Sequence, residues 1–435
     1  MDLDPGTLSA LLLVGILVLL AVGVPLGFAT AFLGMLIAFD QFGIRGVGLV
    51  MQRMYGLTTE YVIISVPLFI FMASLLERSG IARDMYNALN VWLSRTRGGI
   101  AVVTAVMAVI MAAMSGIIGG EIVLLGLIAL PQMLRLGYDR NLAIGTVCAG
   151  GSLGTMIPPS IVLIVYGLIT ETSINALFAA AVIPGLMLGG LYIVYIIVRT
   201  RLQPELAPID ESGALDPGFR EKLWASRGLV PPVLLVFVVL GSIYGGVTGI
   251  TEAAAMGCVG TFLLTAARGE LNLTMLGEAL EQTFRSCGAI LWVTFGATIL
   301  AGSYTLAGGP TYVANSILGA EFDPIGVILM MMLVFILLGM FMDWVGIVLL
   351  AMPVFLPIVT QLGYDPIWFG ILFCINMQVS FLSPPFGPAA FYLKSVCPPD
   401  ISLFDIYRSF WPFILMQLVV LATVLFFPQI ALVLV

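Results

Sequence analysis

The chain has 435 residues, of which 60% are hydrophobic and 9% charged, with a formal net charge of -7 and no histidine. Together with a mean hydropathy of +1.13, this composition excludes a soluble globular enzyme and indicates a polytopic membrane protein. Nucleic acid is not expected as a partner, because the chain carries no basic patch. The five cysteines have the spacing of neither a disulfide framework nor a metal site, and the acidic start, Met1-Asp2-Leu3-Asp4, is not expected to be a cleavable signal.

The first apolar run covers residues 8–39 and is interrupted by Gly23-Val24-Pro25. It fits either one long tilted span or two short ones. A span is expected over 57–76. The polar segment 77–99 has an amphipathic middle, which fits either a helix along the membrane interface or an ordinary loop helix.

The run 100–134 is the most informative in length. Its 35 residues are too many for one span of roughly 20 and too few for two spans with a loop. Its centre, from Ser115 to Glu121, is rich in glycine and favours a turn. We therefore predict a re-entrant hairpin here, followed by spans over 142–170 and 174–197.

The span over 142–170 is expected to be broken. At its centre lies Gly150-Gly151-Ser152-Leu153-Gly154-Thr155-Met156-Ile157-Pro158-Pro159-Ser160. Two adjacent prolines lack backbone donors and disfavour the helical conformation in the residues before them. A broken helix is tolerated in hydrocarbon only where it is buried in protein or lines a polar cavity. The first half, residues 1–198, therefore contains one predicted hairpin and one predicted broken span.

A polar linker over 199–228 is predicted to lie in the cytoplasm and to separate the halves. The second half, 229–435, contains these predicted elements: spans over 229–250, 251–267 and 287–307, a short amphipathic stretch to about 281, an overlong run 324–360 that turns near Gly339–Trp344, a broken span 366–393, and a last span 410–435. The broken span contains Ser383-Pro384-Pro385. The fold predicted is thus all-α, with a hairpin and a broken helix in each half.

Nine identities recur at a constant offset of 226 residues. They join Pro131, Leu136-Gly137-Tyr138-Asp139, Cys148, Pro158-Pro159 and Tyr166 to Pro357, Leu362-Gly363-Tyr364-Asp365, Cys374, Pro384-Pro385 and Tyr392. Such a match indicates an internal repeat. Two interrupted membrane segments in corresponding positions are typical of secondary transporters with a site at the repeat interface. The alternative is that the prolines kink the helices for packing alone.

Charge supports this layout. With both hairpins re-entrant, only Arg45 and Arg53 of the 17 Lys and Arg residues lie outside, which leaves 15 in the cytoplasm. The chain then crosses five times between the two Leu-Gly-Tyr-Asp runs. An odd number of crossings predicts that the repeats are inverted.

The predicted site lies where the hairpin tips and the helix breaks meet. Freed amides there can bind a carboxylate, and freed carbonyls can coordinate a small cation. For each nearby hydroxyl the alternative is a bond to its own helix backbone. Glu121 and Asp343 are carboxylates in apolar runs, where a functional role is the default. The alternatives are a position at the wet mouth of the hairpin for Glu121 and a structural cap for Asp343.

The stretch Ala149–Ser160, preceded by Arg135-Leu136-Gly137-Tyr138-Asp139, resembles the large membrane subunit of tripartite ATP-independent periplasmic (TRAP) transporters. Val66-Pro67-Leu68-Phe69, Ile183-Pro184-Gly185 and Pro384-Pro385-Phe386-Gly387 fit the same pattern. The resemblance covers nearly the whole chain. The first tip departs from it, because Ile117-Ile118-Gly119-Gly120-Glu121 is poorer in Ser, Thr and Ala than that family's usual sequence.

The resemblance implies an elevator-type importer of an organic acid in the bacterial inner membrane, driven by sodium and without another cofactor. It implies two partners: a separate small subunit of four spans and a periplasmic binding protein. The residues expected to bind substrate are Ser115, Gly116, Gly119, Glu121, Ser160, Asn376 and Gly387. The residues expected to form the sodium sites are Gly150, Gly151, Ser152, Thr155, Pro158, Gly339, Asp343, Ser380, Ser383 and Pro384.

Two other functions remain open from the sequence. A stand-alone divalent-anion/sodium symporter of related architecture would need no binding protein. A membrane-embedded hydrolase or lipid-modifying transferase lacks support, because the sequence has no histidine and no paired acid–base residues at recognisable spacing.

Overall fold

The computed structural model describes residues 4–93, 96–116, 118–208, 218–319 and 322–435. Within these ranges all regular structure is helical, with no β-strand. Seven helices in the described ranges are long and apolar enough to cross a membrane. Many large apolar side chains on the outside of the helices are exposed, for example Leu13 on the first helix and Phe237 on a later span. In a membrane protein such side chains contact lipid.

The helices of the first half are α1 (Pro5–Ala21), α2 (Leu26–Phe42), α3 (Ile44–Thr59), α4 (Ser65–Arg78), α5 (Ile81–Leu93), α6 (Gly99–Ser115), α7 (Gly120–Arg135), α8 (Arg140–Ser152), α9 (Ile161–Thr170) and α10 (Ile174–Leu202). One 3₁₀ turn, Tyr61–Ile64, leads into α4, and another, Leu153–Thr155, follows α8.

The helices of the second half are α11 (Phe219–Ala225), α12 (Val230–Tyr244), α13 (Ile250–Ala267), α14 (Leu273–Leu306), α15 (Gly309–Leu318), α16 (Pro324–Gly339), α17 (Trp344–Gln361), α18 (Pro366–Leu382), α19 (Pro388–Lys394), α20 (Leu403–Phe426) and α21 (Gln429–Leu432). Short 3₁₀ turns at Pro204–Leu206 and Ser226–Leu229 flank the linker.

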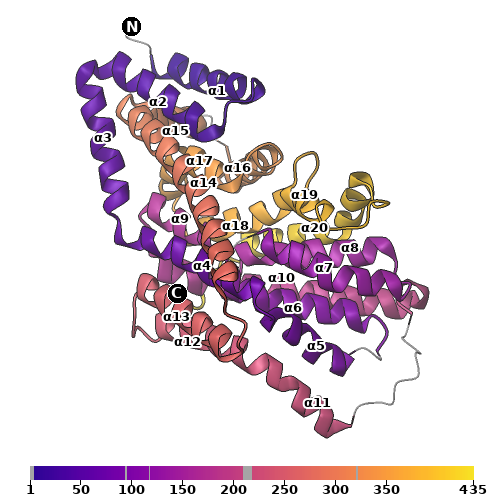
Figure 1. The fold of residues 1–435 in the computed structure, drawn as a ribbon. Helices are drawn as coiled ribbons and strands as arrows, with labels where there is room; N and C mark the ends of the chain where they lie inside the picture. The colour runs from indigo at the N-terminus through magenta and orange to yellow at the C-terminus, as the bar shows by residue number, and fades with distance from the viewer. Residues whose placement is uncertain (1–3, 94–95, 117, 209–217, 320–321) are drawn as a thin grey trace.

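The helices pack into two groups. The long helix α14 lies against α2, α3 and α4, and α13 lies against α4 and α12. The second group consists of α6–α10 with α16–α20, in which α8 contacts α6, α7 and α20, and α18 contacts α16 and α20. Figure 1 shows α1–α3 with α14 and α15 at one side of the molecule and α5–α8 with α10 at the other. The hairpins and broken helices all belong to the second group.

Several boundaries differ from the sequence-based predictions. The run 8–39, for which the sequence left one span or two open, forms two helices, α1 and α2, with Gly23 at φ 90° in the turn between them. The expected amphipathic stretch up to 281 and the span 287–307 are one continuous helix, α14, so the prediction of two elements is wrong. The linker expected from 199 starts after Leu202, because Arg199 and Arg201 continue α10. Both lie in the last turn, where the helix dipole stabilises positive charge.

Each overlong run forms two helices joined by a short turn. The first run ends α6 at Ser115 and begins α7 at Gly120, and in the second run residues 340–343 join α16 to α17. Each proline-containing span is interrupted: α8 and α9 are separated by the 3₁₀ turn and residues 156–160, and α18 and α19 by residues 383–387. The Pro158–Pro159 and Pro384–Pro385 peptide bonds are both cis.

The helix contacts keep the same pattern when the halves are exchanged. The arm α7 of the first hairpin packs on α19 of the second break, and α17 of the second hairpin packs on α9 of the first. In the same way α8 packs on α20, and α18 packs on α10. The halves are therefore interlocked, because each hairpin contacts the broken helix of the other half.

Candidate functional site

The tip of the first hairpin rests on the first helix break. Gly116 ends α6 with φ 64°, and its carbonyl oxygen accepts a hydrogen bond of 3.3 Å from the Ile161 amide. A Cβ at Gly116 would collide with the Pro159 carbonyl oxygen. Gly119 begins α7 at φ 114°, where a Cβ would lie 3.0 Å from the Tyr392 ring. Two predicted substrate residues, Gly116 and Gly119, thus allow this close seating.

The carboxylate of Glu121 is enclosed beside this tip. Its residue is fully buried, and one carboxylate oxygen accepts a hydrogen bond from the Ser115 hydroxyl. The other oxygen has no hydrogen-bond partner within the described ranges. A wet position at the mouth of the hairpin is therefore wrong for Glu121. The side chain of Glu77, at the end of α4, reaches the position that a Cβ on Gly120 would take, so two carboxylates approach the first turn of α7.

The hydroxyls of the first break donate hydrogen bonds to nearby backbone carbonyls, which is the alternative that the sequence analysis left open. Ser152 donates to the Ala149 carbonyl oxygen at 2.8 Å, and Thr155 donates to the Ser152 carbonyl oxygen at 3.2 Å. Ser160 donates to the Thr155 carbonyl oxygen at 2.5 Å and accepts from the Leu163 amide at the start of α9. All three are buried. A hydroxyl that donates its proton still has lone pairs that can coordinate a cation.

The second break has the same chemistry. Ser380 donates to the Asn376 carbonyl oxygen at 3.1 Å, and Ser383 donates to the Val379 carbonyl oxygen at 2.8 Å. Asn376 is fully buried, and its side-chain oxygen has no hydrogen-bond partner among the described residues. Gly387 begins α19, where a Cβ would lie 2.7 Å from the Phe381 and Ser383 carbonyl oxygens.

Gln378 connects the two breaks. Its side-chain amide donates to the Ser152 carbonyl oxygen at 2.8 Å and to the Thr155 hydroxyl at 2.5 Å. Gln378 occupies the position of Ser152 in the repeat, since the two are 226 residues apart. Contact between equivalent positions is what a two-fold relation places at its axis. Sequence reasoning missed this residue, although its presence in an apolar helix and its repeat position were both visible.

The remaining predicted ion-site residues have packing or capping roles in the structure. Gly150 and Gly151 let α8 approach Ala108 and Ile122 closely, and a Cβ at Gly339 would collide with Ser380. Asp343 begins α17, and its carboxylate accepts from the Val345 amide at 3.4 Å, as a structural cap does. Pro158 and Pro384 lie at the interruptions themselves, the one between α8 and α9 and the other between α18 and α19.

No group of three or more Cys, Asp or Glu side chains able to hold a metal ion occurs in the described residues. The polar atoms that gather at the breaks are instead neutral oxygens of hydroxyls, amides and carbonyls. One of them, the side-chain oxygen of Gln378, is buried and lacks a hydrogen-bond partner in the described part of the chain, like that of Asn376. Such a donor set fits a monovalent cation better than a divalent one, which recruits carboxylates.

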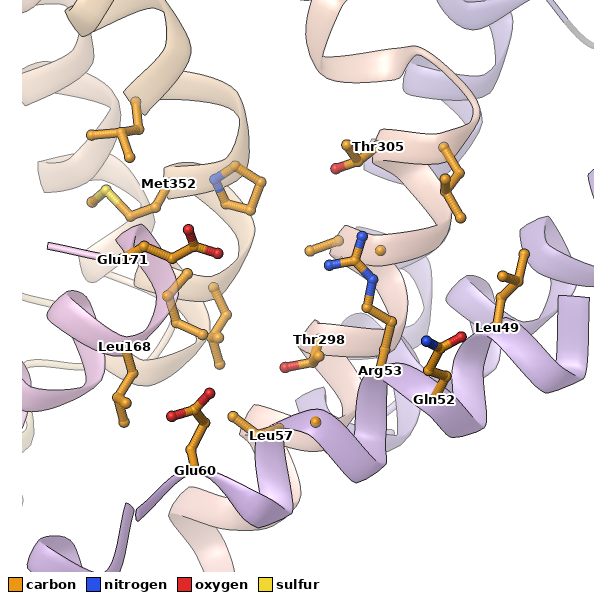
Figure 2. A pocket seen from close by; sticks show the side chains of 18 of the residues that line it. Leu49, Gln52, Arg53, Leu57, Glu60, Leu168, Glu171, Thr298, Thr305 and Met352 are labelled. Atoms are coloured by element: carbon orange, nitrogen blue, oxygen red, sulfur yellow. The ribbon is translucent and has the colours of Figure 1, made fainter. Parts of the chain in front are cut away.

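A cavity of about 670 Å³ lies between the two groups of helices, which also contact each other directly where α17 meets α14. Its walls come from α3 and α14 on one side and from α17 and the end of α9 on the other. Figure 2 shows the Arg53 guanidinium of α3 at one wall, the carboxylate of Glu60 at the end of the same helix, and the carboxylate of Glu171 at the opposite wall. Arg53 packs along Gly302 of α14 and is the only cationic residue of this lining.

None of the predicted site residues lines this cavity. Sequence reasoning missed Arg53 and Glu60 because the segment 44–59 was not expected to be a helix. The signal was present: Arg45 and Arg53 are the two cations that the charge distribution leaves outside. The hydroxyl of Thr298, in the same lining, is buried without a hydrogen-bond partner among the described residues.

Interlocked hairpins, broken helices with buried neutral oxygens and a cavity between two helix groups define a polytopic membrane transport protein. Residues 13–430 match the family model of the tripartite ATP-independent periplasmic transporter, DctM component. The chain therefore belongs to the DctM family of large TRAP permease subunits.

Individual relatives agree with this assignment, and a solved structure shares the fold. The chain is 31% identical over 436 residues to an ectoine/5-hydroxyectoine TRAP transporter large permease protein of Ruegeria pomeroyi, with 98% of each chain covered. It is 29% identical over 400 residues to a C4-dicarboxylate TRAP transporter large permease protein of Pseudomonas aeruginosa, with 91% of each covered. Its fold resembles the Alcanivorax borkumensis YdaH transporter, with a TM-score of 0.64, 18% identity and 89% and 88% of the two chains covered.

Proposed function

We propose that this chain is the sodium-coupled transport subunit of an importer for an organic acid in the bacterial inner membrane. It works with a separate small membrane subunit and with a periplasmic binding protein that delivers the solute. Membership of the DctM family supports both partners. No cofactor besides the coupling ion is part of the proposal.

The observation that carries the proposal is the meeting of two broken helices at buried neutral oxygens. The Gln378 amide ties the Ser152 carbonyl to the Thr155 hydroxyl, and the Asn376 and Gln378 side-chain oxygens are left without hydrogen bonds from described residues. A buried acceptor without a partner costs roughly 1–3 kcal/mol. A sodium ion would remove that cost by coordination. Its own affinity would then depend on oxygens contributed by both halves.

The exchange of helix contacts between the halves supports an inverted repeat. If α6–α10 and α16–α20 move as one body against α2–α4 and α12–α15, the cavity between the groups is the space that opens and closes. The proposed elevator motion therefore takes place at the wall formed by α3, α14, α9 and α17. Both helix breaks travel with the moving body, so ion and solute move together.

Arg53 is proposed as the first basic contact for the solute carboxylate on this path, because it is the only cation in the cavity lining. Glu60 and Glu171 give the same lining an excess of negative charge. Carboxylates at a low-dielectric cleft raise the local concentration of cations. The same space can therefore concentrate sodium while Arg53 holds the acid.

The test is transport by proteoliposomes of defined composition. The chain alone, the chain with its small subunit, and the complete system with solute-loaded binding protein are compared under an inward sodium gradient. Only the complete system is expected to accumulate solute, and replacing sodium by choline should abolish uptake. Robust uptake by the chain alone would favour a stand-alone symporter and contradict the proposal, as would full uptake without sodium.

A further inference from the structure

A second cavity, of about 380 Å³, shares no lining residue with the Arg53 cavity. It is formed by the beginning of α8, the last turns of α10 and the first turns of α20. Its polar lining includes Arg199, Arg408, Asp139 and Asn141. Both arginines belong to the cluster of cations that the charge distribution assigns to the cytoplasmic side.

The two guanidinium groups are available to a ligand. Neither Arg199 nor Arg408 forms an ion pair or a hydrogen bond with another described side chain. The one acidic residue of the lining, Asp139, already caps α8, since its carboxylate accepts from the Leu142 amide at 2.9 Å. The cavity therefore presents two guanidinium groups that no described carboxylate contacts by a hydrogen bond, although Arg408 also lies in the field of Asp405 one turn earlier on α20. With Asp139 as the one acid of the lining, the net positive charge favours an anion.

The rest of the lining is apolar and aromatic. Tyr195 and Phe413 meet edge to face, with ring centroids 5.4 Å apart, and Leu142 and Pro412 continue this wall. Trp411 follows Arg408 by three residues on α20 and is 59% exposed. Exposed tryptophan is typical of the membrane–water interface, where its ring sits at headgroup level. An apolar wall does not stabilise a free, fully hydrated anion, whereas it can contact the acyl chains of an anionic lipid.

We propose that this cavity binds the headgroup of an anionic phospholipid of the cytoplasmic leaflet. The phosphate lies between Arg199 and Arg408, whose planar forks suit bidentate contact with phosphate oxygens. The acyl chains run past Trp411 along the outer face of α20. Basic pockets between spans at the cytoplasmic side are suited to such headgroups. The lipid would join α10 to α20, which occupy corresponding places in the two halves.

The experiment uses the purified full-length chain and equilibrium lipid binding measured by native mass spectrometry. The probes are phosphatidylglycerol and phosphatidylcholine of matched acyl chains. Arg199→Gln and Arg408→Gln are each expected to weaken phosphatidylglycerol binding by about tenfold, since each removes charge-assisted hydrogen bonds. Arg201→Gln is the matched control, because Arg201 lies on the same last turn of α10 and does not line the cavity. It should change binding by less than about twofold.

Trp411→Ala separates a lipid from a free phosphate. It should weaken phosphatidylglycerol binding, because the ring contacts the lipid, whereas the affinity for inorganic phosphate should not change. Three results would overturn the proposal: equal loss of binding in Arg201→Gln and Arg199→Gln, equal affinity for phosphatidylcholine and phosphatidylglycerol, or displacement of the lipid by inorganic phosphate at low millimolar concentration. The thermal unfolding midpoint of each lipid-free variant identifies any that has lost its fold. If Arg408→Gln has, Arg408→Lys replaces it; this variant keeps the charge but loses the planar fork, so it should weaken binding by a smaller factor.

Discussion

The two helix breaks share one backbone design but differ in their surroundings. Every residue from Gly151 to Ser160 in the first break is buried, and the tip of the first hairpin is hydrogen-bonded to it. In the second break, residues 384–386 are exposed, and Phe386 makes a ring contact with Phe341 of the second hairpin turn at 6.2 Å. These two rings are 58% and 65% exposed.

This difference suggests a division of work between the halves. The first break is fixed on all sides by protein, so substitutions in it should mainly cost stability. The second break reaches the surface through two aromatic rings, so substitutions there should mainly affect solute handling. The two halves can thus share one backbone design while one break forms the fixed base of the proposed site and the other its accessible wall.

The largest effect is expected from Gly116→Ala, at the hairpin tip that rests on the first break. A left-handed backbone costs a side-chain-bearing residue about 1–2 kcal/mol, and displacing the Pro159 carbonyl adds roughly 1–3 kcal/mol. The matched control is Gly363→Ala, which also has a positive φ of 82° but has no atom within 4 Å of the added Cβ. Chemical unfolding in detergent measures both. Equal losses would mean that the hairpin tip is not fixed on the first break.

Gln378→Leu tests the link between the breaks. It removes two hydrogen bonds and should cost about 1–3 kcal/mol of stability, and it should raise the sodium concentration needed for half-maximal uptake. Gln417→Leu is the matched control, because Gln417 is also fully buried and donates to the Tyr192 hydroxyl at 2.9 Å, on helices outside the breaks. If Gln417→Leu shifts the sodium dependence of uptake as much as Gln378→Leu does, the hydrogen bonds of Gln378 have no specific role in sodium binding.

The smallest effect on stability is expected at the second break, from Phe341→Ala and Phe386→Ala. Exposed substitutions usually change stability by about 0.5 kcal/mol or less. We expect each ring to contact the solute, so that loss of one aromatic contact, worth about 0.5–1.5 kcal/mol, should raise the KM for solute uptake two- to twelve-fold. Phe404→Ala, at a site 75% exposed near the start of α20, is the control. Unchanged KM with a large stability loss would reverse the proposed division of work.

The hairpins and breaks could be predicted because their causes are local. A run of wrong length for the bilayer and a pair of prolines each constrain the backbone within a few residues. The Gln378 bridge could not, because it joins side-chain and main-chain atoms 226 residues apart. The helix α3 was missed because its charged and glycine-rich sequence resembles a loop until α14 packs against it.

The same distinction between local and distant causes applies to the site residues. Residue types at the breaks indicated neutral oxygen ligands, and the structure gathers such oxygens there. The sequence did not reveal which glycines serve close packing, as Gly151 does against Ile122, because that depends on the approach of another helix. Nor did it indicate that Glu121 is enclosed by Ser115, since enclosure depends on how the hairpin is seated.

The central claim, that the two breaks together hold sodium, is tested most directly by sodium-dependent stabilisation of the purified chain. An ion that binds only the folded state stabilises it by about 2.7 kcal/mol at a concentration a hundred times its Kd. Sodium, but not choline, should therefore raise the unfolding midpoint of the wild type. Asn376→Leu removes a buried acceptor that has no partner among the described residues, so this variant should be as stable as the wild type without sodium and gain nothing from it. An equal sodium-induced shift in both proteins, or no shift in either, would contradict the claim.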